Sequence, residues 1–189
     1  MASKKQLSSI YPGLLAIFIA GLILAACSSK SNISEESPLI DSQNENQMTI
    51  IEEDYFQVTL PGEWEKISGP DPYVYFNSND KEALTVSMFG RSADINDIDR
   101  SDEFRRLADL RQQAERESSD SLVTSNISYA EQDGTYVASF TASDQDFLSA
   151  TLMLGVERFI AQFFYEGHGV IEAEFSRNTR TIMNSIILY

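Results

Sequence analysis

The second half of the chain constrains the fold most, because four apolar segments follow one another there with only tight turns between them. These segments are Leu122–Ala130, Gly134–Ala142, Phe147–Leu154 and Arg158–Glu166. The Asp133-Gly134 pair between the first two is typical of a two-residue β-hairpin. Connections this short permit antiparallel pairing only, since parallel strands need a long crossover. The sequence therefore predicts a four-strand antiparallel meander.

The last segment of this meander is apolar on both faces. Its apolar residues are Phe159, Ala161, Phe163 and Tyr165 on one face, and Ile160 and Phe164 on the other. A strand with this pattern is covered on both sides. We therefore expect helices, or a helix and a loop layer, on either side of the sheet.

Two segments have the periodicity of covering helices. The first is Ser101–Glu117, with Ser101 at the N-cap and an apolar stripe on one side. The stripe comprises Phe104, Leu107, Ala108, Leu110 and Ala114. The second segment runs from Val170 to about Ile186, and its apolar residues at helical spacing are Ile171, Phe175, Ile182, Met183 and Ile186.

The outer face of the first helix is expected to carry ion pairs. Asp102 with Arg106, and Arg111 with Glu115, are spaced i, i+4, which brings opposite charges together on a helix surface. This spacing predicts that all four side chains are exposed.

The region before the first helix predicts further strands. Phe56, Val58 and Leu60 alternate with polar residues, which indicates a half-buried strand. Tyr73–Asn77 and Leu84–Phe89 are expected to form a hairpin across Asn79-Asp80-Lys81. The predicted fold class is therefore α+β, with an antiparallel meander sheet of about six strands flanked by helices.

Residues 1–26 have the layout of a secretory signal peptide. Lys4 and Lys5 supply the positive start, Leu14–Leu24 the apolar stretch, and Ala25-Ala26 the small residues before a cut. Even counted from Ile10 to Ala26, the apolar stretch is shorter than the roughly 20 residues that span a bilayer. A cleaved signal is therefore expected rather than a retained membrane helix.

Leu24-Ala25-Ala26-Cys27 resembles the lipobox of bacterial lipoproteins. The resemblance implies cleavage between Ala26 and Cys27, with acyl chains such as palmitate added to Cys27, and hence a membrane anchor. Two or more chains hold a protein firmly where one does not. Ser28 instead of Asp after the cysteine implies transfer to the outer membrane in a Gram-negative cell, with the protein facing the periplasm.

Residues 27–47 are predicted to be the lipidated cysteine and a flexible polar tether. Only Ile33, Leu39 and Ile40 are apolar between Ser28 and Gln47, too few to offset the entropy of ordering the segment. A flexible chain of this length has an r.m.s. reach of about 25 Å. Residues 48–189 are then expected to form a single globular α+β domain.

The segment from Phe56 to Trp64, FQVTLPGEW, resembles the opening F-x-V-x-L-P-x-x-W strand of PsbP-like domains, and the order of the predicted elements is also similar. The resemblance implies a PsbP-like sandwich, a fold that includes extrinsic photosystem proteins, a Ran-binding nuclear transport factor and bacterial lipoproteins. The fold-motif residues are Leu60, Pro61, Gly62 and Trp64. Pro61 lacks an N–H and ends a strand, Gly62 allows the reversal, and Trp64 is expected to fold back onto the sheet.

The charge and the cysteine count exclude several functions. The chain has 14 Lys plus Arg against 29 Asp plus Glu, a net charge of −15. A nucleic-acid binder is therefore excluded, because its affinity depends on neutralising phosphates with cations. A single cysteine permits no intramolecular disulfide and no cysteine-based zinc site. No cofactor motif is present.

Two features of the sequence are candidates for a catalytic or metal-binding site. His168 is the only candidate for a general base at neutral pH, but no Gly-x-Ser-x-Gly motif supports a Ser-His-Asp arrangement, and an exposed turn is the expected role. The acidic run Asp94–Glu103 is not an EF-hand: with Asp97 at position 1, Asp102 and Ala108 replace the required Gly and Glu. A weak divalent-ion site in this run stays open.

The sequence favours a protein without enzymatic activity. The first hypothesis is a membrane-anchored binding or accessory module for an envelope protein or complex. The alternative is a carrier of a small apolar or cationic ligand, held by the acidic surface or by the aromatic residues Tyr73, Tyr75, Phe147, Phe163 and Phe164. The least favoured hypothesis is an orphan hydrolase that uses His168.

Overall fold

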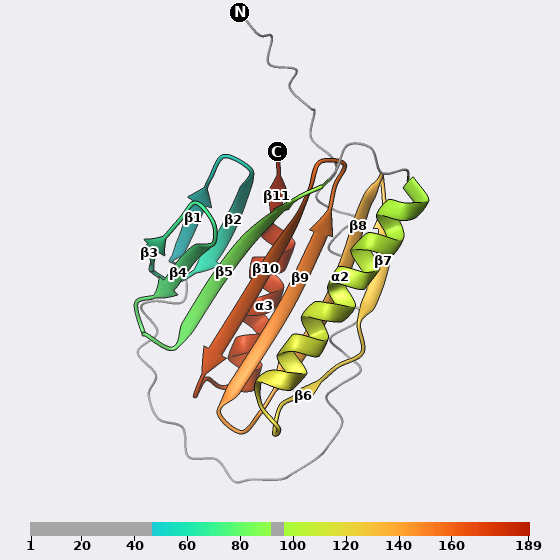
Figure 1. Cartoon of the computed structure of the whole chain (residues 1–189). Coiled ribbons are helices and arrows are strands. Elements are labelled where there is room, and N and C mark those ends of the chain that lie inside the picture. The colour runs from blue at the N-terminus through green and yellow to red at the C-terminus, as the bar shows by residue number, and fades with distance from the viewer. Residues whose placement is uncertain (1–46, 92–96) are drawn as a thin grey trace, which may run out of the picture.

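The computed structural model describes residues 47–91 and 97–189, which form two antiparallel sheets and two helices (Figure 1). The strands of the larger sheet are β3 (Trp64–Ser68), β4 (Tyr73–Asn77), β5 (Glu82–Gly90), β6 (Val123–Thr124), β7 (Ser128–Gln132), β8 (Thr135–Ser143), β9 (Phe147–Gly155) and β10 (Phe159–His168). Their order is β3-β4-β5-β10-β9-β8, and both β6 and β7 pair with β8.

The smaller sheet is formed by strands from the two ends of the described chain. Its strands are β1 (Met48–Glu52), β2 (Phe56–Pro61) and β11 (Ile187–Leu188), in the order β1-β2-β11. The helices are α2 (Asp97–Ser118) and α3 (Glu172–Ser185). Figure 1 shows α2 in front of the larger sheet and α3 behind it. None of the described helices is long and apolar enough to span a membrane.

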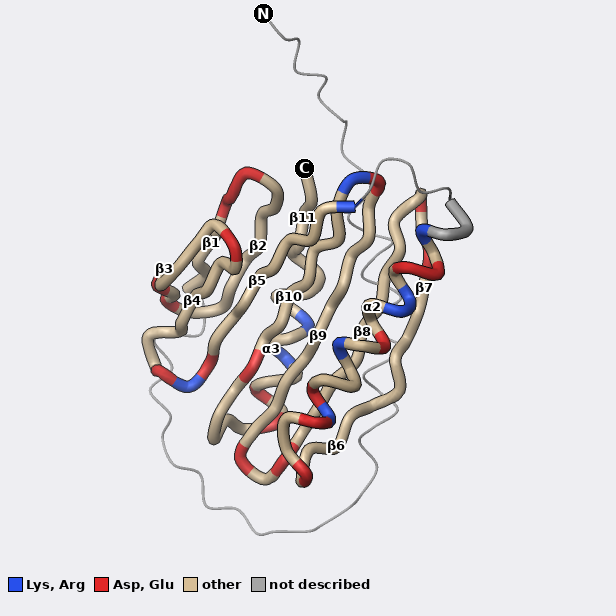
Figure 2. The backbone as a smooth tube through the Cα atoms, in the orientation of Figure 1, with Lys and Arg blue, Asp and Glu red and all other residues tan. Residues whose placement is uncertain are grey.

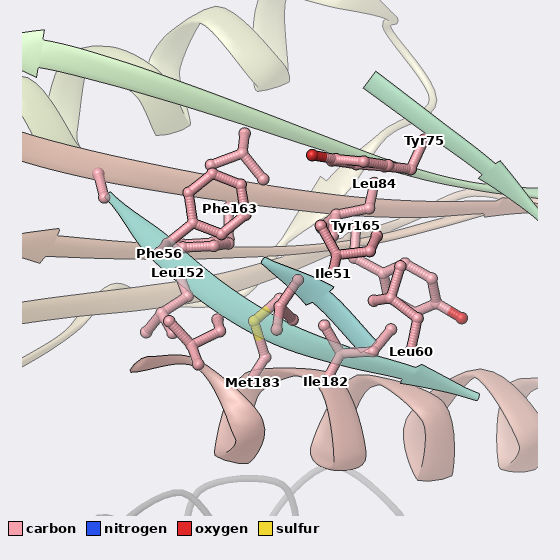
Figure 3. Packing of buried hydrophobic residues seen from close by; sticks show 14 of the residues in the cluster. Ile51, Phe56, Leu60, Tyr75, Leu84, Leu152, Phe163, Tyr165, Ile182 and Met183 are labelled. Carbon is pink, nitrogen blue, oxygen red and sulfur yellow. The ribbon is translucent and has the colours of Figure 1, made fainter. Parts of the chain in front are cut away.

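The main core lies between the larger sheet and a layer made of the smaller sheet and α3 (Figure 3). Phe56 of β2 packs edge-on against Phe163 of β10, with ring centroids 5.5 Å apart. Ile182 of α3 is fully buried in the same cluster. A second, smaller cluster lies on the opposite face, where Phe104 and Ala108 of α2 pack on Met153 and Ile160. The sheet is therefore covered by different elements on its two faces.

The predicted meander is confirmed. β7, β8, β9 and β10 pair consecutively and antiparallel. Asp133 and Gly134 both have positive φ, as a type I′ turn requires. β10 also pairs with β5, a contact between distant segments that closes the sheet. The two-sided apolar pattern of β10 matches its central place in the strand order.

The prediction of about six strands was too low. β3 was missed because, as an edge strand with most of its residues exposed, it has little apolar alternation. The predicted strand Leu122–Ala130 is divided into β6 and β7. Between them, Ser125 keeps the chain beside β8, since its N–H donates to Thr141 O and its hydroxyl accepts from Thr141 N.

The first helix differs from its prediction in start and in orientation. It begins at Asp97 instead of Ser101, so Ser101 is not its N-cap. Phe104 and Ala108 are buried as expected, but Leu110 is 52% exposed and Ala114 is exposed too. Glu115, predicted to lie on the exposed face, is only 4% exposed. The helix therefore uses polar side chains against the sheet in its second half.

The second helix lies close to its predicted position. It spans Glu172–Ser185, and Phe175, Ile182 and Met183 are buried. Ile171, which the helical spacing placed in the apolar stripe, is instead 67% exposed. It precedes the first turn, where the chain has extended dihedral angles and has not yet reached the sheet.

Candidate functional site

The structure brings His168 together with Ser121 and Asp144 in an open depression of about 400 Å³. The loops that follow β8, β10 and α2 meet at this end of the sheet, which no local sequence signal reveals. The backbone N–H of His168 donates to Lys81 O at 2.8 Å, and the imidazole ring lies 5.0 Å from the ring of Phe147.

These three residues do not form a nucleophile–base pair. The Ser121 hydroxyl donates directly to the Asp144 carboxylate, and no hydrogen bond in the described part of the chain joins the His168 ring to either residue. The bonds from Ser121 and from the Gln145 N–H lower the pKa of the Asp144 carboxyl. In a Ser-His-Asp triad the histidine stands between serine and carboxylate, so this arrangement does not activate Ser121.

The described part of the acidic run does not converge on a metal site. Residues 94–96 lie outside the described residues, and Asp97–Glu103 form the first turns of α2. Glu103 accepts a hydrogen bond from Arg91 Nε at 3.0 Å. Among the side chains that the structure describes, in residues 47–91 and 100–189, no group of three His, Cys, Asp or Glu is close enough to hold a metal ion.

The fold-motif residues join β2 to β3. Leu60 is fully buried, and Pro61 is the last residue of β2. Gly62 has φ of +91°, a conformation that side chains disfavour. The half-buried Trp64 donates its indole N–H to Pro61 O at 2.9 Å, and its ring lies 6.4 Å from the Tyr165 ring. Ala26 and Cys27, the predicted cleavage and lipidation positions, lie outside the described residues.

The five aromatic residues considered for a ligand pocket do not line one cavity. Tyr73, Tyr75 and Phe163 are at most 3% exposed and belong to the main core. Phe147 lies beside His168, and Phe164 lies on the opposite face of the sheet from the main core. The structure therefore gives no support to an aromatic ligand pocket.

Glu82, a buried carboxylate, fixes α3 to the larger sheet. It is 4% exposed and accepts hydrogen bonds from the Tyr165 hydroxyl, from Asn178 Nδ2 at 3.1 Å and from Asn79 Nδ2 at 3.3 Å. Burial, followed by the bond to Glu82, raises the pKa of the Tyr165 hydroxyl, so Tyr165 stays a donor. With three donors, Glu82 is satisfied and its role is structural.

A second buried carboxylate, Glu115, fixes α2 to the sheet. It accepts hydrogen bonds from the hydroxyls of Ser149 and Thr151 on β9. Arg111 Nη2 lies 3.9 Å from the same carboxylate, and the guanidinium carbon lies 4.7 Å from the centre of the Phe164 ring on β10. On its other flank, α2 meets β6 and β7, where Arg116 donates to Thr124 Oγ1. Arg111 therefore marks the flank of α2 that faces β10.

Beyond that flank, one half of the sheet face is uncovered by any described element. Figure 1 shows α2 lying over β8 and β9, with β5 and β4 free in front. We call this surface the open face. Its side chains are Val74 and Phe76 of β4, Ala83, Thr85, Ser87 and Phe89 of β5, and Gln162, Phe164 and Glu166 of β10, which are neighbours in the strand register.

The open face mixes apolar and polar side chains, and its exposed aromatic residues lie towards its two ends. Phe76 is 40% and Phe89 is 44% exposed, and Phe164 and Val74 are half-buried. The exposed Leu110 and Ala114 of α2 do not pack on the sheet. Figure 2 shows that the charged residues of β5 and β10 lie mostly near the ends of these strands. Exposed aromatic side chains on an uncovered sheet face are typical of interaction sites, which makes the open face the candidate functional site.

The comparisons with known proteins identify the fold. No protein family model and no curated protein matches this sequence. The solution structure of cyanobacterial PsbP (CyanoP) from Synechocystis sp. PCC 6803 is similar, with a TM-score of 0.52 and 14% identity over 82% of this chain and 98% of that chain. The predicted PsbP-like α+β sandwich is therefore confirmed as the fold.

A second solved structure, a crystal structure from Bacteroides thetaiotaomicron VPI-5482, has a TM-score of 0.41 and 13% identity over 77% of this chain. The match covers 49% of that protein, so this chain spans about half of its length.

Proposed function

We propose that this protein is a lipid-anchored, non-enzymatic binding module of the bacterial envelope, which binds an envelope protein or complex through the open face. The observation that carries the proposal is the uncovered half of the sheet, with Phe76 and Phe89 exposed towards its two ends and the half-buried Phe164 between them. A packed sheet normally buries such residues, and their exposure costs free energy unless a partner covers them.

The anchor in this proposal rests on the sequence. The lipobox at Leu24–Cys27 and the polar segment that follows would hold the protein on the periplasmic side of the outer membrane, on a tether that reaches about 25 Å. The PsbP-like fold supports a non-enzymatic accessory role in general. The arrangement of Ser121, Asp144 and His168 does not favour the hydrolase alternative.

The proposal is tested by chemical crosslinking in intact cells, followed by purification through a C-terminal tag and mass spectrometry. The control is a protein that starts at residue 48 and is exported without the anchor. We expect a specific envelope protein to be recovered with the anchored form and lost or reduced with the control. Recovery of no specific protein from either form would contradict a binding function.

A further inference from the structure

The open face has the width of one helix lying beside α2. The small side chains Ala83, Thr85 and Ser87 follow one another on β5, between Phe164 on β10 and Val74 on β4. From β10 to β4 is two strand spacings, about 10 Å, and an α-helix with its side chains is about 10 Å across. A helix placed along β5 would lie two to three strand spacings, about 10–14 Å, from α2 over β8 and β9, close to the usual distance of 8–10 Å between packed helices.

The charges of the open face define the flanks of such a partner. Glu65 on β3, Phe76, Ala83 and Glu166 form one row across four strands. The two carboxylates are three strand spacings apart, about 14 Å, one on each side of the row of small residues. Arg111 lies beside Glu115 and over Phe164, so it is already engaged with this protein's own residues. A partner between the carboxylates is therefore favoured if it carries cations on both flanks.

We propose that the open face binds one amphipathic α-helix of an envelope protein, with its apolar stripe along β5 and Lys or Arg on both flanks near Glu65 and Glu166. This inference rests on the proposed binding function and names the partner's chemistry. A second copy docked through the same face would bring four carboxylates together, which is unfavourable. An anionic lipid surface is disfavoured for the same reason.

The test uses the full mature chain in nanodiscs of neutral lipid and a fluorescent synthetic helix as the probe. β5 is nine residues long, or roughly 30 Å, which corresponds to a helix of about 20 residues. The probe therefore has about 20 residues, with one Leu stripe and Lys on both flanks. Two comparison peptides carry Glu in place of Lys, or the same composition without a stripe. Empty nanodiscs give the background.

We expect the striped Lys peptide to bind at least ten-fold more tightly than either comparison peptide. Phe76→Ala and Phe89→Ala, which truncate the exposed aromatic residues at the two ends of the face, are each expected to weaken binding about ten-fold. Glu65→Gln combined with Glu166→Gln should weaken it and reduce its salt dependence. Ile50→Ala and Ile187→Ala, at exposed positions of the smaller sheet, should leave it unchanged.

Equal binding of all three peptides, no binding at all, or equal weakening by the smaller-sheet variants would overturn the helix proposal. Self-association of the chain that Phe76→Ala abolishes would assign the open face to a second copy instead. Binding of peptide-free anionic vesicles that Phe76→Ala abolishes would assign it to a lipid surface. If in-cell crosslinking still recovers a specific envelope protein while the peptides fail, the helix inference falls and the binding function stands.

Discussion

At the scale of single residues, buried carboxylates determine how α2 is attached. Glu115 is 4% exposed and accepts a hydrogen bond from the hydroxyl of Ser149. Ser149 is itself 1% exposed. Taking a carboxylate out of water costs free energy, and the two hydroxyls of β9 offset part of that cost. The attachment is therefore specific in position, because another register of the helix would leave the carboxylate unpaired.

We expect Glu115→Ala to lower the free energy of unfolding by about 1–3 kcal/mol, the usual cost of leaving a buried donor such as Ser149 without its acceptor. Urea unfolding followed by circular dichroism measures this. Glu117→Ala removes an exposed carboxylate one half-turn away and should change stability by less than about 0.5 kcal/mol. Equal effects of the two substitutions would show that Glu115 does not attach the helix.

The stability of the protein should also depend on Glu166. Burial raises the pKa of its carboxyl above the usual value of 4.5; His168 and Arg111 oppose this rise, and Glu115 adds to it. The folded state therefore holds this proton more tightly than the unfolded state. Consequently the contribution of Glu166 to stability falls as the pH rises from the unfolded pKa through the folded one.

Glu166→Gln removes this titration. Relative to the wild type, the variant should be more stable at pH 7, and the difference should shrink towards pH 4, where the wild-type carboxyl is also neutral. Urea unfolding at a series of pH values measures the difference. Glu131→Gln, on the exposed side of β7, controls for the loss of one negative charge. A stability difference that is the same at pH 4 and pH 7 would contradict the assignment.

At the scale of elements, α2 depends on a glycine beneath it. A Cβ at Gly155 would lie 2.7 Å from Cδ2 of the Phe104 ring, which is 1% exposed and has little room to move. Gly90 pairs with Phe159 of β10, next to Ile160, which pairs with Gly155, and a Cβ at Gly90 would meet nothing within 4 Å. Replacing each glycine by alanine therefore distinguishes the effect of a clash with α2 from the effect of the substitution on the backbone alone.

Gly155→Ala is expected to cost about 1–3 kcal/mol through overpacking against Phe104. Gly90→Ala should be neutral or slightly stabilising, because it only restricts the unfolded chain. Thermal unfolding followed by circular dichroism distinguishes the two, with a shift in Tm of roughly 2–4 °C per kcal/mol for a chain of this size. A Gly155→Ala protein as stable as the Gly90→Ala protein would show that α2 is not packed against β9 at this point.

How far the sequence predicts the fold depends on where each element packs. The meander and α3 were predictable because their turns and apolar spacing are local signals, as the Asp133-Gly134 turn shows. The orientation of α2 was not, because the apolar stripe placed Ala114 and Leu110 towards the sheet, whereas Glu115 lies there. Only the hydroxyls on β9, more than 30 residues further along the chain, make that orientation favourable.

The candidate site was less predictable than the fold. The sequence places Phe164 on the second face of its strand and predicts that both faces are covered. The pairing of β10 with β5 places Thr85, and beyond it Val74, next to Phe164. This pairing joins segments about 80 residues apart, so the sequence alone gave no signal that part of this face is open.

At the scale of the whole molecule, the anchor determines where the protein acts. Cys27→Ala should give an uncleaved and unlipidated precursor with the same globular domain, because the cysteine thiol is the expected site of acylation. Detergent phase partitioning and the migration of the protein on gels measure processing. Normal cleavage and partitioning of the Cys27→Ala protein would contradict the lipobox assignment.

The central claim is that the anchored protein binds its partner through the open face, and one measurement tests it most directly. A photo-crosslinking amino acid is placed at Phe89 on the open face and, separately, at Ile50 on the smaller sheet, both about half exposed or more, in the full anchored chain in intact cells. We predict one discrete crosslinked envelope protein from the Phe89 position and none from the Ile50 position. The same partner from both positions, or a partner from Ile50 alone, would contradict the claim.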